Sequence, residues 1–93
     1  MVAYDLAWLR NEVLSRSPDD AGLLAAVEAA GEPLTVGAAY VLFVSAANPN
    51  QPGSDWQFAR NVVFDDTDRG MVVLDLLQDG RLGGIEFPDQ VRS

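Results

Sequence analysis

The chain has 93 residues, the size of one domain, and its 48% apolar content is typical of globular proteins. Its 14 acidic and 6 basic residues give a net charge of −8, which should repel nucleic acid and anionic membranes, so neither is an expected partner. The absence of Cys, His and Lys excludes disulfides, zinc sites built from Cys and His, and catalysis by those side chains, and no metal or cofactor is expected.

The first third of the chain, residues 1–34, predicts a pair of helices. The first helix covers residues 4–16, and its apolar face is formed by Val2, Leu6, Leu9 and Val13. Ser17 is followed by Pro18 and two aspartates, a pattern typical of a helix N-terminus with Ser17 as its cap. The second helix should end near residue 30, with Gly31 as the residue that closes it.

The second predicted helix has two different faces. The face with the larger side chains is formed by Leu23, Leu24, Val27 and Ala30. A second face has only small side chains, from Ala21, Ala25 and Ala29. Another element of the protein could approach this small-residue face closely.

The remainder of the chain, residues 35–93, predicts an antiparallel sheet. Its β-branched and aromatic residues favour four strands, over 38–46, 58–64, 71–77 and 81–87. The segment between the first two strands, residues 47–56, is rich in Asn, Pro, Gly and Ser and predicts a long loop. In an alternative interpretation residues 35–45 are helical, with Thr35 as the cap, but their β-branched and aromatic content argues against it.

A two-residue turn at Asp79-Gly80 predicts the register of the last two strands. It pairs Leu77 with Leu82, and Asp75 with Gly84. The face expected in the core then carries Val72, Leu74, Leu76, Ile85 and Phe87. The opposite face carries Val73, Asp75, Leu77, Leu82 and Glu86, and on it Asp75 and Glu86 are diagonal neighbours.

This hairpin resembles the C-terminal part of a small bacterial family, the domain of unknown function 2283. The likeness spans residues 71–87 and rests on Asp75, Asp79, Gly80, Arg81, Gly84, Ile85 and Glu86. Leu77 replaces an acidic residue of the family pattern. The resemblance implies a small β-meander and no particular activity.

The pair of carboxylates at Asp75 and Glu86 is the candidate for acid–base catalysis, because two nearby carboxylates can shift each other's pKa and supply an acid and a base. The alternative, which we favour, is structural: an arginine pairs with the two groups, or water solvates them. The candidate arginines are Arg60, Arg69 and Arg81. The spacing also fits parts of a calcium-binding EF-hand loop, but Leu77 offers no ligand atom and the flanking segments are strands, so no metal site is predicted.

Aromatic side chains mark two candidate interfaces. Tyr4 and Trp8 lie on the side of the first helix opposite Leu6 and Leu9, so that helix is either enclosed between the second helix and the sheet or meets another chain. In the 47–56 loop and at its end, the candidate contacts are Asn48, Asn50, Asp55 and Trp56. This loop is either functional or merely long.

These patterns predict one α+β domain over residues 1–93, with two helices packed on a four-stranded antiparallel meander. The expected function is that of a small acidic, non-catalytic interaction module, which binds a second copy of itself or another protein. The alternatives are a small-molecule binding protein with an apolar pocket between helices and sheet, and an enzyme that uses Asp75 and Glu86. The first ten residues carry no basic n-region of a signal peptide, so a cytoplasmic location is expected.

Overall fold

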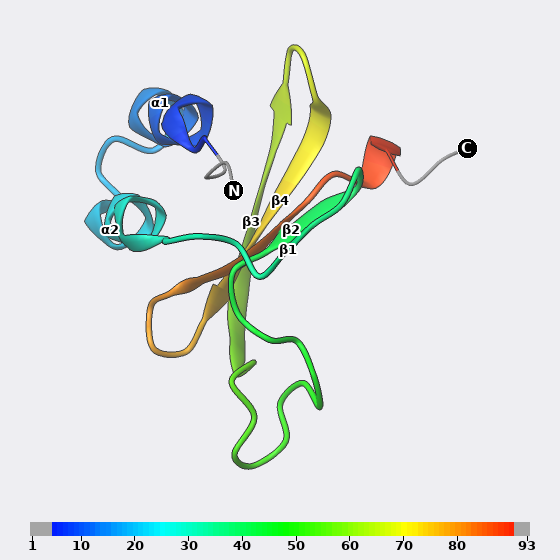
Figure 1. Ribbon diagram of the computed structural model, residues 1–93. Helices are drawn as coiled ribbons and strands as arrows, with labels where there is room; N and C mark the ends of the chain where they lie inside the picture. Colours follow the sequence, from blue (N-terminus) through cyan, green and yellow to red (C-terminus); the bar gives the residue numbers. More distant parts are fainter. Residues whose placement is uncertain (1–4, 91–93) are drawn as a thin grey trace.

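Two helices lie against one side of a five-stranded antiparallel sheet (Figure 1). The structure, a computed structural model, describes residues 5–90. Its elements are α1 (Ala7–Arg16), α2 (Ala21–Ala29), β1 (Thr35–Val36), β2 (Tyr40–Leu42), β3 (Phe58–Asp66), β4 (Gly70–Leu77), β5 (Leu82–Glu86) and a short 3-10 helix, η1 (Pro88–Gln90). The predicted α+β class is confirmed. Residues 35–45 contain the short strands β1 and β2 rather than the alternative helix, and the strand predicted over 38–46 is present only as β2. Within residues 5–90, no helix has the length and apolar character needed to cross a membrane.

The sheet differs from the prediction in its strand number and order. It has five strands rather than four, in the order β1-β2-β5-β4-β3, so only β3, β4 and β5 form a meander. The chain leaves β2 through the long loop and returns at the far edge as β3, which gives a Greek-key order. Val41 of β2 lies opposite Ile85 of β5, and both are almost fully buried. Burial of these branched side chains favours this pairing.

The two helices begin later than their sequence signals predicted. Asp20, not Ser17, caps α2: its side chain accepts a hydrogen bond from the Leu23 backbone N–H. Ser17 instead lies at the C-terminal end of α1, where its backbone N–H donates to the Val13 carbonyl. The prediction was wrong because aspartate is as good a cap as serine. Residues 17–20 form a turn instead of the first turn of the helix, in which the Asp20 backbone N–H donates to the Ser17 carbonyl. Gly31 does follow α2, but it does not adopt a left-handed conformation.

The β4–β5 hairpin reaches the predicted register by another route. Its turn has three residues, because the Leu77 N–H donates to the Arg81 carbonyl and Gly80 adopts a φ of 89°. This shifts the pairing, so Leu82 lies opposite Leu76 and joins the core, whereas the sequence predicted it on the other face. A bulge at Gly83 restores the predicted pairing of Asp75 with Gly84.

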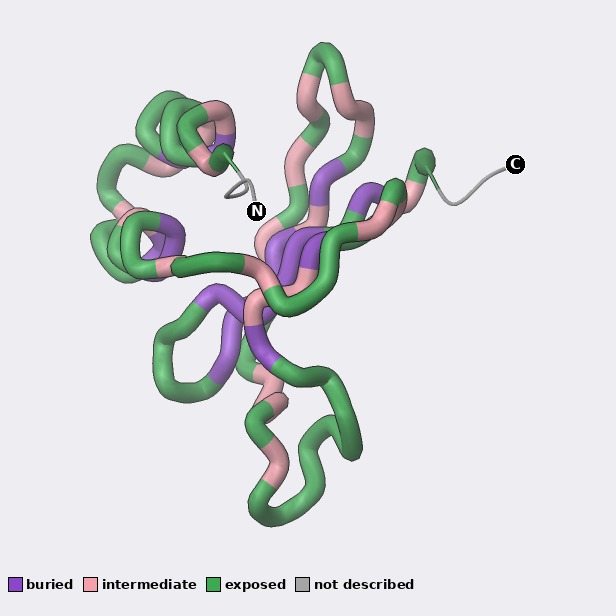
Figure 2. Tube along the Cα trace, viewed as in Figure 1, coloured by how far each residue is buried: buried purple, intermediate pink, exposed green. Residues whose placement is uncertain are grey.

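The core lies between the helices and the sheet, where the buried segments gather in Figure 2. Each helix contributes the face that its apolar spacing predicted, and the predicted core face of the hairpin is also buried. The cluster contains Leu9, Val13, Leu23, Ala26, Val27, Val41, Val72, Leu74, Leu76, Leu82, Ile85 and Phe87. The opposite side of the sheet has no helix over it in the described part of the chain.

Candidate functional site

Asp75 lies on the open side of the sheet, in the middle of β4, and is only 5% exposed. Asn61 of the neighbouring strand β3 donates a hydrogen bond of 2.9 Å to its carboxyl oxygen Oδ1. Burial, together with the carboxyl group of Glu86 beside it, raises the pKa of Asp75 to about 7, against the lowering effect of Asn61. The predicted proximity of Asp75 and Glu86 is therefore present, and Asp75 is part protonated near neutral pH.

The structural interpretation expected an arginine, or else water, beside Asp75 and Glu86, and no arginine among residues 5–90 pairs with either group. The three candidate arginines bind other carboxylates: Arg60 binds Asp20, Arg69 binds Asp66 and Arg81 binds Asp79. The other two described arginines are also paired, Arg10 with Glu28 and Arg16 with Glu12. The main cavities of the described part of the chain are lined by other residues. Asp75 and Glu86 therefore interact with each other rather than with an arginine, and neither lines one of these cavities.

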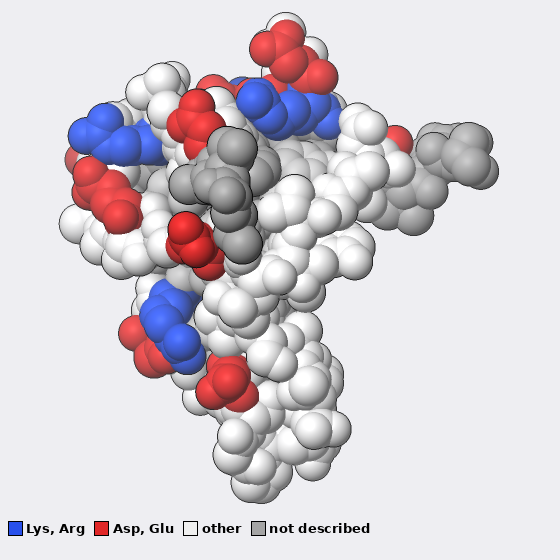
Figure 3. Space-filling view, in the orientation of Figure 1, with Lys and Arg blue, Asp and Glu red and all other residues white. Residues whose placement is uncertain are grey.

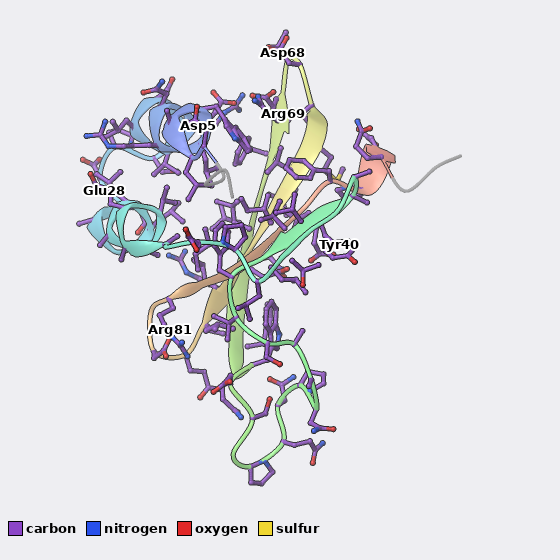
Figure 4. The ribbon with its side chains drawn as sticks, in the orientation of Figure 1. Asp5, Glu28, Tyr40, Asp68, Arg69 and Arg81 are labelled. Carbon is purple, nitrogen blue, oxygen red and sulfur yellow. The ribbon has the colours of Figure 1, made fainter. Side chains whose placement is uncertain are left out.

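Trp8 is half-buried, and its ring is occupied within the molecule. The Arg69 guanidinium carbon lies 3.9 Å from the centre of the ring, and the ring of Phe87 lies 6.1 Å away. Arg69, which is labelled in Figure 4 near the β3–β4 turn, also binds Asp66. This stack holds α1 against the sheet, which corresponds to the enclosed arrangement rather than an interface; Tyr4 lies outside the described residues.

The long loop is fastened to the sheet by its own polar groups and by Trp56. The backbone N–H of Asn50 donates to the Trp56 carbonyl, and its side-chain oxygen accepts from the Phe58 N–H at 2.9 Å. The Trp56 ring lies against Gly83 and Gly84, so closely that a Cβ at Gly83 would meet it at 2.8 Å. Asn50 and Trp56 therefore have internal structural roles.

The two other candidate contact residues of the loop, Asp55 and Asn48, are exposed. Asp55 is exposed and makes no hydrogen bond or ion pair among the described residues. Asn48 is also exposed, and it adopts a left-handed backbone conformation with a φ of 50°.

A cavity of about 500 Å³ lies between α2 and the β4–β5 turn. Its wall on α2 includes Ala25 and Ala29 from the small-residue face that the sequence predicted. Phe43, Val44 and Leu82 supply larger apolar side chains. Arg81 and Asp79 lie at the turn, and Figure 4 places Arg81 below α2. A largely apolar cavity therefore lies beside α2, with no residue of α1 in its lining.

An uncharged surface covers one edge of the sheet and the loop that follows it. Residues 33–54 include no Asp, Glu, Lys or Arg, although 22% of the chain is charged. The corresponding surface in Figure 3 is almost free of charged atoms. Within it Leu34 is 65% exposed, Val36 is 58% exposed, and Tyr40 is also exposed. We call the strand β1, which includes Val36, together with the neighbouring Leu34 and Tyr40, the uncharged edge.

The opposite edge of the sheet, β3, is protected. It carries the charged residues Arg60, Asp65 and Asp66, and an irregularity in its pairing with β4 between Phe58 and Arg60. The Arg16 guanidinium from α1 donates a 2.6 Å hydrogen bond to the Asp65 carbonyl. Charges, bulges and covering groups are the usual means by which proteins prevent pairing at an exposed strand, and β1 lacks charges of its own.

The uncharged edge was absent from the candidate sites predicted from sequence. The sequence does contain a long segment without charged residues. Because β1 was not predicted, nothing indicated that this segment forms an edge of the sheet. The candidates that were predicted do not form one site: Trp8 lies on the helical side of the sheet, and Trp56 and Asp75 on the other.

No family model, curated protein or solved structure matches this chain.

Proposed function

We propose that this protein is a small acidic interaction module that binds a second copy of itself through the uncharged edge. The main support is that residues 33–54, which include no charged residue, cover a sheet edge where Leu34 and Val36 are exposed. Antiparallel pairing of β1 with β1 about a two-fold axis would join the two sheets and bury these side chains.

Charge supports a second copy as the occupant. Two chains that each carry a charge of −8 repel one another wherever their charged groups come within about one Debye length, roughly 8 Å at physiological salt. The uncharged edge lets two copies approach while their carboxylates stay apart. The other edge is less suitable because β3 carries the carboxylates Asp65 and Asp66, and the Arg16 guanidinium already binds the Asp65 carbonyl.

The test uses two valines that differ in place but hardly in exposure. Val36 at the uncharged edge is 58% exposed, and Val63 on the open sheet face is 56% exposed. Light scattering behind gel filtration should give a dimer for the wild type and for Val63→Lys, and a monomer for Val36→Lys. Circular dichroism should show that both variants remain folded, because each lysine can extend into solvent.

Two results would contradict this proposal. A wild-type protein that stays monomeric at high micromolar concentration removes self-association altogether. A dimer broken by Val63→Lys and unaffected by Val36→Lys places the interface on the open sheet face instead.

A further inference from the structure

The cavity between α2 and the β4–β5 turn exists because the side of the helix that faces it carries no long side chain. The helical residues along this wall are Gly22, Ala25, Ala26 and Ala29, and Ala30 and Gly31 extend it beyond the helix. A Cβ at Gly31 or at Gly80, across the cavity, would meet no atom within 4 Å. The space is therefore set by the sequence of α2 rather than by loose packing, since the same helix packs Leu23 and Val27 tightly on its other side.

The lining is suited to an apolar molecule that enters from solvent. Val44 and Leu82 form a buried apolar base, and Phe43 adds an aromatic ring. Gly22, Ala25 and Ala29 are exposed, so the cavity is open to solvent along the helix. Its volume of about 500 Å³ lies within the range usual for small-molecule sites. Because the wall follows nearly the whole of α2, an elongated shape fits better than a compact one.

One end of the cavity offers a positioned cation. The Arg81 Nε donates to the Asp79 Oδ2 at 2.6 Å, and the Arg81 backbone N–H donates to Asp79 Oδ1. Both carboxylate oxygens of Asp79 thus accept hydrogen bonds from Arg81. The two terminal guanidinium nitrogens of Arg81 make no hydrogen bond among residues 5–90. Those nitrogens match the two oxygens of a carboxylate.

We infer that this cavity binds an elongated apolar molecule with one terminal carboxylate, such as a medium-chain fatty acid, with the chain along α2 and the carboxylate on Arg81. This site is separate from the uncharged edge, and the inference does not depend on self-association. Asp79 acts as a positioning residue, because it holds the Arg81 guanidinium in place and leaves the terminal nitrogens free.

The test titrates the full chain with decanoate, kept below its micelle concentration, and follows backbone amide NMR shifts and the melting temperature. Shifts should concentrate at residues 22–31 and 79–82, and the melting temperature should rise. Ala29→Leu should weaken these effects because the leucine side chain takes up part of the cavity along α2, whereas Ala21→Leu, on the same helix but outside the cavity lining, should keep them. Leucine and alanine both favour helix, so neither variant should unfold α2.

The carboxylate contact is tested separately. Arg81→Gln should weaken decanoate binding about tenfold, as expected for loss of a charge-assisted contact. Arg10→Gln is the matched control, because the Arg10 side chain is 52% exposed and that of Arg81 is 53% exposed. Decanol, which lacks the carboxylate, should bind about as weakly to the wild type as decanoate binds to Arg81→Gln.

Four results would overturn the inference. The absence of shifts at residues 22–31, or equal binding to Ala29→Leu, removes the cavity as the site. Equal affinity for decanol and decanoate removes the carboxylate as the recognised group. Shifts centred on the uncharged edge mean that decanoate only coats exposed apolar surface.

Discussion

At Asp75 the folded environment reverses the usual behaviour of a carboxyl group. Burial and the neighbouring Glu86 raise its pKa from 3.8 to about 7, so the folded chain holds this proton more tightly than the unfolded chain. Protein stability must then fall as pH rises from about 4 to about 7, and above that range the whole loss persists without further change from this group. The full shift corresponds to a few kcal/mol at about 1.4 kcal/mol per pKa unit.

We predict that Asp75→Asn stabilises the protein at pH 8 by on the order of 2 kcal/mol and has little effect at pH 4, because it removes the carboxylate that burial disfavours. Urea unfolding at both pH values measures this. Asp79→Asn is the control: the pKa of Asp79 is lowered, first by the Arg81 backbone N–H, so this group affects stability in the acid range and in the opposite direction. A wild-type stability that does not fall between pH 5 and 7 would contradict the predicted pKa of Asp75.

At the scale of elements, the β4–β5 hairpin connects the core to the long loop. Its three-residue turn and the bulge at Gly83 offset each other, which brings Leu82 to the core while Asp75 stays on the open side. The same bulge places two glycines under the Trp56 ring. Trp56 can lie against the sheet only because Gly83 and Gly84 have no side chains. This contact anchors the loop, which has no regular secondary structure.

We predict that Gly83→Ala destabilises the protein by about 1–3 kcal/mol, because its Cβ would lie 2.8 Å from the rigid Trp56 ring and 3.0 Å from Leu77. Gly31→Ala provides the control, since no atom lies within 4 Å of its Cβ and its φ is not positive. Thermal unfolding measures both, and Trp56 fluorescence should change only in Gly83→Ala. Equal stability of the two variants would mean that Trp56 does not rest on the glycine pair.

At the scale of the whole molecule, charge is distributed unevenly around the sheet. Arginine–carboxylate pairs connect the helices to each other and to β3, as between Arg10 and Glu28 or Arg60 and Asp20. The edge at β1 has no charged residue of its own. The net charge of −8 opposes association wherever the charged groups of two copies come close together.

We predict that salt strengthens self-association. Between about 10 and 150 mM salt the Debye length falls from roughly 30 Å to 8 Å, which screens the repulsion between two acidic chains but leaves apolar contacts at β1 intact. Analytical ultracentrifugation should give a lower dimer dissociation constant at the higher salt concentration. A dimer that weakens as salt is added would instead be held by ion pairs, contrary to the proposed interface.

The sequence by itself determined the local features of this protein. Apolar spacing identified the buried faces of both helices, β-branched runs identified the strands from 40 onward, and Asp79-Gly80 located the hairpin turn. These signals act between near neighbours in the chain, so they can be read without the fold. They also indicated the proximity of Asp75 and Glu86, because hairpin register depends on a few adjacent residues.

Only the tertiary structure decided which distant groups meet. The place of β2 beside β5, the stack of Arg69 on Trp8 and the contact of Trp56 with Gly83 each join segments far apart in sequence. The same holds for the partners of the arginines, since a charge pairs with whichever carboxylate the fold brings near. The cavity and the uncharged edge likewise required the fold, because a small helix face and an uncharged interval become surfaces only when their neighbours are known.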